Sequence, residues 1–242
     1  NFISNKFKDD SFKFMNYGYF KDNFHLELDN DDENERYPIH LYHHVASQVN
    51  LEGLKILEVG SGRGGGASFI ARYHQPLSVT GIDISSNAIN LCNKSYNIDN
   101  LNFLLGDSEN IPFEDNYFDA VINVESSHCY PSLSKFINEV TRVLKPGGSF
   151  LYCDLLVAST LDNHLSQLSN DKLSLINYTD ITENIIKASE LMTKDRNKII
   201  SKIKSPILKK ILSSFASVKG SKIYESFVNR HYKYINSISK KK

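Results

Sequence analysis

Short apolar runs alternate along the chain with longer segments in which apolar residues recur at helical spacing. The short runs predict strands over 55–59, 77–83, 101–105, 118–124 and 149–155. The segments between them predict helices over 35–49, 67–73, 87–96 and 133–144. Strands that alternate with helices indicate right-handed crossovers and a parallel sheet covered on both faces. We therefore predict a doubly wound α/β core over residues 51–156.

The two ends of the chain depart from this alternation. Residues 1–34 are polar and aromatic and end in an acidic run, so residues 1–50 are predicted to form an N-terminal cap with a helical arm. After Leu156 the apolar positions keep helical spacing for about sixty residues, which predicts a helical lid over 157–217 above the strand ends. Residues 218–242 then predict a short helix and a last strand that closes the sheet. One domain, 1–242, is expected.

Length and composition agree with a single folded domain. The chain has 242 residues, 40% of them hydrophobic and 23% charged, which suits a buried core and excludes disorder. Its apolar runs are shorter than the roughly 20 residues that cross a bilayer. The three cysteines are scattered, which favours a reducing compartment, and we expect a cytoplasmic protein.

The formal net charge of zero hides an asymmetry between the two parts of the chain. Residues 1–156 hold 12 Lys and Arg against 21 Asp and Glu, whereas residues 157–242 hold 16 against 7. A basic C-terminal part is most simply a solvated helical surface, and at most it makes transient contact with anionic membranes. The neutral total charge and the lack of a recognised motif argue against a nucleic-acid partner. The oligomeric state is left open.

A glycine-rich segment, 58–66, follows the first predicted strand and opens the next helix. Backbone amides in such a loop can face a ligand without a Cβ in the way. Gly60, Gly62 and Gly65 satisfy the spacing of the dinucleotide fingerprint. Asp83 follows about twenty residues later, where a carboxylate binds ribose hydroxyls. Because every nucleoside cofactor has a ribose, this pattern alone fits NAD as well as S-adenosylmethionine.

Glu58 distinguishes the two cofactors. It lies two residues before Gly60, where a carboxylate would repel a pyrophosphate and favour the ammonium group of an amino acid. S-adenosylmethionine carries that ammonium and no phosphate, so it is the predicted cofactor.

These residues, within about 54–155, resemble the class I S-adenosylmethionine-dependent methyltransferases. The string Glu58-x-Gly60-x-Gly62-x-Gly64 is similar to the first motif of that class, and Lys145-Pro-Gly-Gly148 is similar to the turn before its fifth strand. The resemblance implies a Rossmann-like, mostly parallel seven-stranded sheet. It implies that Asp83 binds the ribose and that Asp107 lies beside the adenine. The implied cofactor-binding residues in these motifs are Glu58, Gly60, Ser61, Gly62, Gly64, Asp83, Ile84, Gly106, Asp107 and Ser108.

The candidate acceptor site follows from the sheet topology. Ligands of doubly wound folds gather at the carboxyl ends of the strands, which here are residues 123–131 and 153–155. His128 can accept a hydroxyl proton at neutral pH, and Asp154 can orient its ring. The alternative is a histidine that caps the next helix or pairs with a buried carbonyl. Asn123 and Glu125 are predicted to bind the methionine end of the cofactor.

A narrower resemblance concerns two strings, Phe14-Met-Asn-Tyr17-Gly-Tyr19 and 125–131. Together they are similar to bacterial O-methyltransferases that act on lipid-like or polyketide-derived hydroxyls, such as the phthiotriol dimycocerosate and fatty-acid methyltransferases. This resemblance implies that Tyr17 and Tyr19 close over cofactor and acceptor, although aromatic residues there can also be core packing.

The predicted function is therefore methyl transfer to a hydroxyl of a small, hydrophobic molecule, with His128 as general base. One alternative keeps the cofactor and methylates carbon or nitrogen of a quinone, sterol or amine. A second is a noncatalytic S-adenosylmethionine-binding protein, and a third is an NAD-dependent dehydrogenase. No metal is expected, because His40, His43 and His44 have no carboxylate or cysteine beside them to complete a site.

Overall fold

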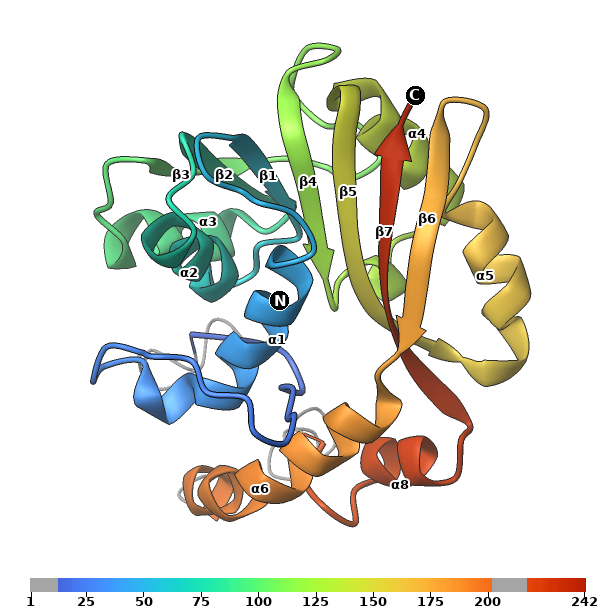
Figure 1. The fold of residues 1–242 in the computed structure, drawn as a ribbon. Coiled ribbons are helices and arrows are strands. Elements are labelled where there is room, and N and C mark those ends of the chain that lie inside the picture. The colour runs from blue at the N-terminus through green and yellow to red at the C-terminus, as the bar shows by residue number, and fades with distance from the viewer. Residues whose placement is uncertain (1–12, 202–216) are drawn as a thin grey trace.

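A seven-stranded sheet forms the centre of the molecule (Figure 1). The computed structural model describes residues 13–201 and 217–242. The strands are β1 (Lys55–Val59), β2 (Ser78–Asp83), β3 (Leu101–Leu105), β4 (Phe118–Val124), β5 (Leu144–Val157), β6 (Leu173–Asp180) and β7 (Tyr232–Lys241). Their order is β3-β2-β1-β4-β5-β7-β6, with β1 to β5 parallel and β7 antiparallel to both of its neighbours. The predicted doubly wound, mostly parallel sheet is confirmed.

Helices cover both faces of the sheet. They are α1 (Arg36–Ala46), α2 (Gly65–Tyr73), α3 (Ser86–Ser95), α4 (Leu133–Val143), α5 (Leu161–Gln167), α6 (Thr182–Ser201) and α8 (Lys222–Val228), with short 3-10 turns at Glu33–Glu35, Ser127–Cys129 and Ala158–Thr160. Helices α1, α2 and α3 share one apolar cluster with the sheet, and α4 and α5 share the other. Successive side chains of the central strands point to opposite faces of the sheet. Each face carries its own apolar cluster, as a parallel sheet covered by helices on both sides requires.

The segment after β5 corrects one prediction. Residues 157–217 were predicted as a helical lid, but Leu173–Asp180 forms strand β6 at the edge of the sheet and supplies its seventh strand. Backbone pairing with β7 stabilises this strand, and Ile176 and Tyr178 stay exposed on it. An edge strand without an alternating buried face lacks the hydrophobic period by which strands are recognised. The part of the predicted lid that is both helical and described is α5 and α6, and residues 202–216 lie outside the described residues.

The N-terminal segment and α6 lie together beyond the carboxyl ends of the parallel strands (Figure 1). Asn184 of α6 pairs with Phe20 through both its backbone oxygen and its side-chain amide. Arg196, near the end of α6, donates to the Asn16 carbonyl at 3.0 Å. The N-terminal segment, residues 13–28, is thus hydrogen-bonded to α6 at Asn16 and Phe20. The first twelve residues of the predicted arm lie outside the described residues.

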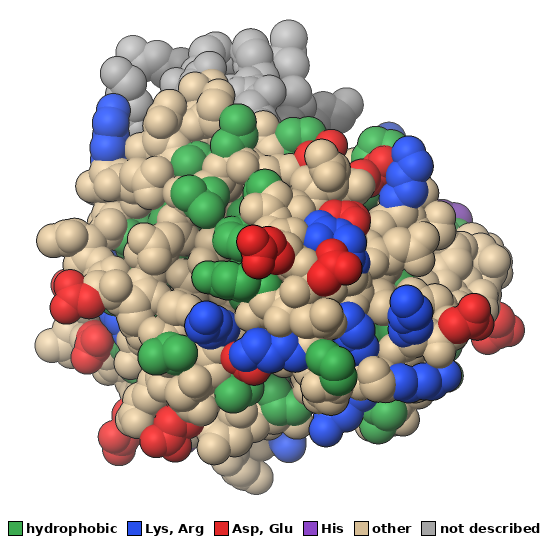
Figure 2. All heavy atoms as spheres, turned by 90° about the horizontal axis from the view of Figure 1, so that it is seen from above, with side chains coloured by type: hydrophobic (Ala, Val, Ile, Leu, Met, Phe, Trp, Pro, Cys, Tyr) green, Lys and Arg blue, Asp and Glu red, His purple; other side chains and the backbone are tan. Residues whose placement is uncertain are grey.

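The opposite end of the molecule, where the chain ends, carries both signs of charge (Figure 2). Lys and Arg side chains are interspersed there with Asp and Glu. The Nζ of Lys241 donates to the Leu144 carbonyl at 2.6 Å and to the Asn116 side-chain oxygen at 2.7 Å. This lysine is therefore bound to the start of β5 and to the loop before β4. Over residues 13–201 and 217–242, no helix combines the length and the hydropathy of a membrane span.

Candidate active site

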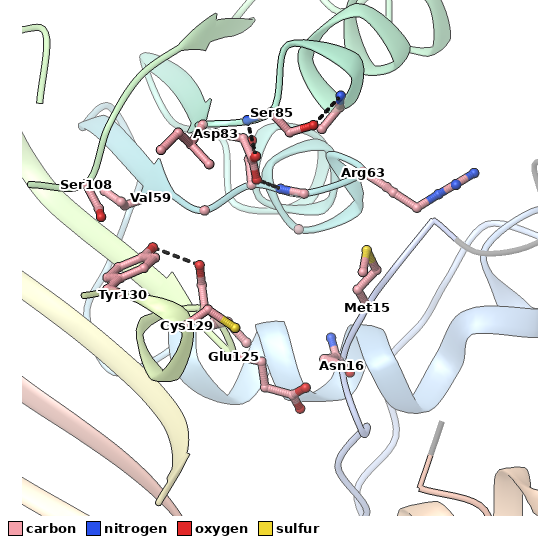
Figure 3. Close-up of a pocket in the computed structure, with 18 of the residues that line it drawn as sticks. Met15, Asn16, Val59, Arg63, Asp83, Ser85, Ser108, Glu125, Cys129 and Tyr130 are labelled. Atoms are coloured by element: carbon pink, nitrogen blue, oxygen red, sulfur yellow. Dashed lines mark hydrogen bonds between the residues drawn. The ribbon is translucent and has the colours of Figure 1, made fainter. Parts of the chain in front are cut away.

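A cavity of about 670 Å³ opens at the carboxyl ends of β1, β2 and β4, and the N-terminal segment forms its far wall (Figure 3). The predicted site residues that line it are Tyr17, Gly60, Ser61, Gly62, Asp83, Ile84, Gly106, Asp107, Ser108, Glu125 and His128. The predicted residues outside its lining are Tyr19, Glu58, Gly64, Asn123 and Asp154. The sheet topology thus brings together most of the residues that the sequence motifs indicate.

The glycine loop needs its glycines for two physical reasons. Gly60, Gly62 and Gly64 have φ values of +77°, +54° and +79°, a region that L side chains rarely adopt. A Cβ on Gly60 would also lie 1.8 Å from the Ser126 hydroxyl oxygen. At Gly60 the loop therefore lies so close to the turn after β4 that only a residue without a Cβ fits.

The amides of this loop already have acceptors within the protein. Those of Gly60 and Ser61 donate to the Ile82 carbonyl at 2.8 and 3.0 Å, and that of Gly62 donates to Asp83 at 2.9 Å. A pyrophosphate cradle needs such amides to face the ligand. The loop therefore fits a cofactor without phosphate groups, such as S-adenosylmethionine, better than one with a pyrophosphate, such as NAD.

Asp83 ends β2 and is aimed into the cavity (Figure 3). Its two carboxylate oxygens accept from the Gly62 amide at 2.9 Å and the Ser85 amide at 2.8 Å. Asp83 does not cap the helix that follows it, because the N-cap of α3 is Ser85, whose hydroxyl accepts from the Ala88 amide. Each oxygen of Asp83 keeps a lone pair for a diol, as a ribose-binding carboxylate requires.

Glu58 lies behind the loop and is 1% exposed. Burial raises the pKa of its carboxyl to about 8, and the nearby Tyr42 hydroxyl and Ala67 amide counteract burial without meeting hydrogen-bond geometry. Tyr42 itself lines the cavity. Ionisation of this carboxyl is costly in the cofactor-free protein, and a cation on the cavity side, such as an amino-acid ammonium, would stabilise the ionised form.

His128 and Asp154 form a hydrogen-bonded pair at the ends of neighbouring strands. The His128 Nδ1 and the Asp154 Oδ1 are 2.7 Å apart. Asp154 is fully buried, and it also accepts from the Ser127 hydroxyl and from the amides of His128 and Leu155. Burial lowers the pKa of His128, but Asp154 and Glu125 outweigh it, so the pKa lies above its usual value. With Nδ1 donating to Asp154, Nε2 is the ring nitrogen left for a ligand in the cavity.

Glu125 is the first residue after β4 and has a φ of +47°. Its Oε1 accepts from the Tyr17 amide at 2.7 Å and the Tyr234 hydroxyl at 2.5 Å. Burial raises the pKa of this carboxyl to about 7. In Figure 3 the carboxyl points into the cavity, toward Asn16 on the opposite wall. The hydrogen bond from the Tyr17 amide to Glu125 holds the N-terminal segment against the sheet.

The two tyrosines of the N-terminal segment have different environments. The Tyr17 ring packs against Phe227 and Tyr234 and lines the cavity. Tyr19 is 5% exposed and stacks on His44 with ring centroids 4.3 Å apart, away from the cavity. The predicted closing role therefore has a structural basis for Tyr17, whereas Tyr19 packs into the core.

Several residues that line the cavity have no role predicted from the sequence. Met15 and Asn16 face it from the N-terminal segment, and Tyr130 faces it from the turn after β4 (Figure 3). The Tyr130 hydroxyl is 2.7 Å from the Ser126 hydroxyl and accepts from the Asn123 amide at 3.0 Å. Asn123 therefore shapes the wall from behind instead of lining it. Met15, Asn16 and Tyr130 lie in the two strings that carry the narrower resemblance, and that resemblance is the signal in the sequence that points to them.

The histidines of α1 serve packing. His40 contacts Phe24 edge to face, His44 stacks on Tyr19, and burial lowers the pKa of both to about 4. In the described part of the chain no three His, Cys, Asp or Glu side chains are placed to hold a metal ion.

Comparison with known proteins defines the class. Residues 57–152 match the family model described as a methyltransferase domain. The fold is shared with geranyl diphosphate C-methyltransferase from Streptomyces coelicolor A3(2), with a TM-score of 0.69 at 17% identity over 93% of this chain and 91% of that one. It is also shared with the cyclase SpnF, with a TM-score of 0.67 at 20% identity over 93% of this chain and 86% of that one. The chain is a class I S-adenosylmethionine-dependent methyltransferase, and S-adenosylmethionine is its cofactor.

Two curated relatives narrow the class. The chain is 37% identical over 219 residues to the fatty-acid O-methyltransferase of Mycolicibacterium smegmatis, covering 90% of this chain and 80% of that protein. It is 36% identical over 222 residues to the phthiotriol/phenolphthiotriol dimycocerosates methyltransferase of Mycobacterium leprae, covering 91% and 82%. The protein belongs to the methyltransferase family of these two enzymes. The predicted class and cofactor are confirmed, and the alternatives of an NAD-dependent dehydrogenase and of a noncatalytic binding protein are set aside.

The first testable consequence concerns Asp83. Asp83→Asn removes the negative charge that would accept both ribose hydroxyls, so we expect the affinity for S-adenosylhomocysteine to fall about tenfold or more. Isothermal titration calorimetry measures it. Asp99→Asn, at an exposed position, is the matched control and should bind as wild type does. Unchanged binding by Asp83→Asn would exclude the ribose contact.

A second prediction concerns Glu58. Its carboxyl has a pKa raised to about 8 in the folded protein. A raised folded pKa contributes stability at low pH that is lost as pH rises toward 8. Glu58→Gln should therefore match the thermal midpoint of the cofactor-free wild type near pH 5 and exceed it by roughly 10 °C at pH 8.5. The same variant should bind S-adenosylhomocysteine more weakly. Scanning calorimetry at the two pH values measures the difference, and a difference that does not grow with pH contradicts the assignment.

Proposed function

We propose that this methyltransferase acts on a hydroxyl group of a small, lipid-like molecule, with His128 as general base and Asp154 as the group that orients it. The observation that carries the proposal is the 2.7 Å hydrogen bond between His128 Nδ1 and Asp154 Oδ1 at the wall of the cavity. It leaves Nε2 as the proton acceptor and stabilises the imidazolium that forms.

The reaction needs a base because an alkyl hydroxyl is a poor nucleophile while it keeps its proton. Bound S-adenosylmethionine supplies an electrophilic methyl group on a sulfonium. A bond forms between the acceptor oxygen and the methyl carbon while the carbon–sulfur bond breaks, and the hydroxyl proton moves to His128 Nε2. The products are a methyl ether and neutral S-adenosylhomocysteine, and the buried Asp154 carboxylate offsets the charge gained by His128.

The class of acceptor rests on the relatives and on the wall of the cavity. The names of the two relatives refer to a fatty acid and to phthiotriol dimycocerosates. Met15, Tyr17 and Pro131 line the cavity, and an apolar acceptor would pack against them. The segment of residues 13–28 that is tied to α6 would exclude water from the reacting atoms, which favours proton transfer to His128.

His128→Ala tests the proposed base. With hexadecan-1-ol as probe acceptor and labelled S-adenosylmethionine, we expect kcat to fall about 10²- to 10⁴-fold while S-adenosylhomocysteine affinity stays near that of wild type. Methyl transfer is followed by the label and by a mass gain of about 14 daltons, the difference between CH₃ and H. His231→Ala, at an exposed position, is the control. Full turnover of hexadecan-1-ol by His128→Ala would exclude His128 as the general base.

The pH dependence of the reaction tests the role of Asp154. A base must be unprotonated, so kcat/KM should rise with pH through a midpoint above the usual histidine value of 6.5, because Asp154 and Glu125 raise the pKa of His128. Asp154→Asn removes the first of these charges, so the midpoint should move to lower pH while the plateau falls. A midpoint that does not move in Asp154→Asn would exclude electrostatic coupling between the two residues.

A carboxyl acceptor is the second candidate, favoured by the name of the M. smegmatis relative. A carboxylate has no proton to remove, so a protonated His128 would bind it and His128→Ala would raise KM with little change in kcat. Glu125, whose carboxyl points into the cavity, disfavours an anionic acceptor. Hexadecanoic acid and hexadecan-1-ol, compared at equal concentration, separate the two candidates, because a higher kcat/KM for the acid contradicts the hydroxyl proposal.

A further inference from the structure

A chain of hydrogen bonds continues from Asp154 into the protein, away from the cavity. The Ser127 hydroxyl donates to the Asp154 Oδ2 at 2.7 Å. It also lies 2.8 Å from the Tyr152 hydroxyl, which in turn lies 2.8 Å from the Nε2 of His164 on α5. Ser127, Tyr152 and Asp154 are all buried. A single connected path thus runs from His128 in the cavity to His164 on helix α5.

Counting protons gives the direction of this path. Ser127 has one hydroxyl proton, which goes to Asp154, so the Tyr152 hydroxyl must donate to the Ser127 oxygen. The single proton of Tyr152 is then used, and its oxygen must accept from the Nε2–H of His164. Every O–H and N–H along the path therefore points toward the Asp154 carboxylate.

The path needs a polar residue where packing alone would favour an apolar one. The Tyr152 ring is fully buried among apolar side chains, 5.7 Å from the Phe150 ring in the same cluster. A phenylalanine would fill this layer as well, and a buried hydroxyl costs free energy unless it is hydrogen-bonded. Both of its hydrogen bonds belong to the path between His164 and Ser127, so the hydroxyl has a place only as part of this path.

We propose that Ser127, Tyr152 and His164 are positioning residues for methyl transfer, which hold the Asp154 carboxylate in one orientation and moderate the basicity of His128. This inference rests on the proposed function of the His128–Asp154 pair. Aligned donors polarise one another in a medium of low dielectric and disperse the charge of the carboxylate that they reach. Without them, the negative charge of Asp154 would act more strongly on the imidazolium and the carboxylate would be free to rotate.

Few ionisable groups act on the two histidines at the ends of this path. Those that act on His128 are Asp154 on β5 and Glu125 on the turn after β4. Tyr17 from the N-terminal segment and the neighbouring Cys129 also line the cavity beside them. The charge that acts on His164 is that of Asp154, and burial keeps the pKa of His164 below its usual value. His164 is therefore neutral near pH 7, as a donor through Nε2 with a fixed tautomer.

The test measures the pKa of His128 directly, without an acceptor. The ¹⁵N-labelled protein, saturated with S-adenosylhomocysteine, is titrated by NMR as wild type, Ser127→Ala and Tyr152→Phe. Loss of donors should raise the pKa of His128 by about half a unit in both variants, opposite in sign to the effect of Asp154→Asn. With hexadecan-1-ol, kcat should fall about 2- to 10-fold. An unchanged or lowered pKa in both variants would overturn the inference.

His164 and a matched tyrosine provide the controls. His164→Gln keeps an N–H donor toward Tyr152 and should retain the wild-type pKa of His128, whereas His164→Leu should raise it as Tyr152→Phe does. Tyr224→Phe also removes a hydroxyl, one that donates to Glu190, and should leave the titration unchanged. Equal titrations for His164→Gln and His164→Leu would exclude the donor role of His164. Because the titration uses no acceptor, full turnover by His128→Ala would disprove the proposed function and leave the result for the path readable.

Discussion

The reversal of strand order between β1 and β4 is the constraint on which the site depends. The chain builds β1, β2 and β3 outward in one direction and then returns to place β4 on the other side of β1. At such a reversal the connections after the two central strands diverge and leave a crevice at the carboxyl edge. Here the glycine loop after β1 and the turn after β4 form the crevice, and they come so close that Ser126 occupies the space of a Cβ on Gly60.

Three carboxyl groups lie at or behind the wall of this crevice, and their environments differ. Asp154 accepts four hydrogen bonds and stays where its donors hold it. Glu125 accepts from a backbone amide and a tyrosine hydroxyl, whereas burial outweighs the nearby Tyr42 hydroxyl and Ala67 amide at Glu58 and raises its pKa to about 8. A site that binds a sulfonium and an ammonium gains from negative charge, while the cofactor-free fold is destabilised by burying it. Binding of the cofactor and stability of the protein are therefore coupled through these groups.

Much of the core could be predicted because its signals are local. A strand buried on both faces reads as a continuous apolar run, and the predicted strands 55–59 and 118–124 agree with β1 and β4. The N-cap of α3 is another local signal, because the Ser85 hydroxyl accepts from an amide only three residues further on. Strand β6 was missed because pairing with β7, which is distant in sequence, stabilises it. The same reason applies to Tyr19, whose stacking partner lies on α1.

The sequence by itself determined the class of the protein, its cofactor and the residue types at the crevice, because the motifs that carry them lie within short segments beside predicted strand ends. Only the tertiary structure decided that Glu58 lies behind the cavity wall, that Tyr17 and not Tyr19 lines the cavity, and that Asp154 is linked through Ser127 and Tyr152 to His164. These outcomes depend on contacts between residues far apart in the chain. Such contacts form only when the sheet closes and the helices pack on it, so no local pattern records them.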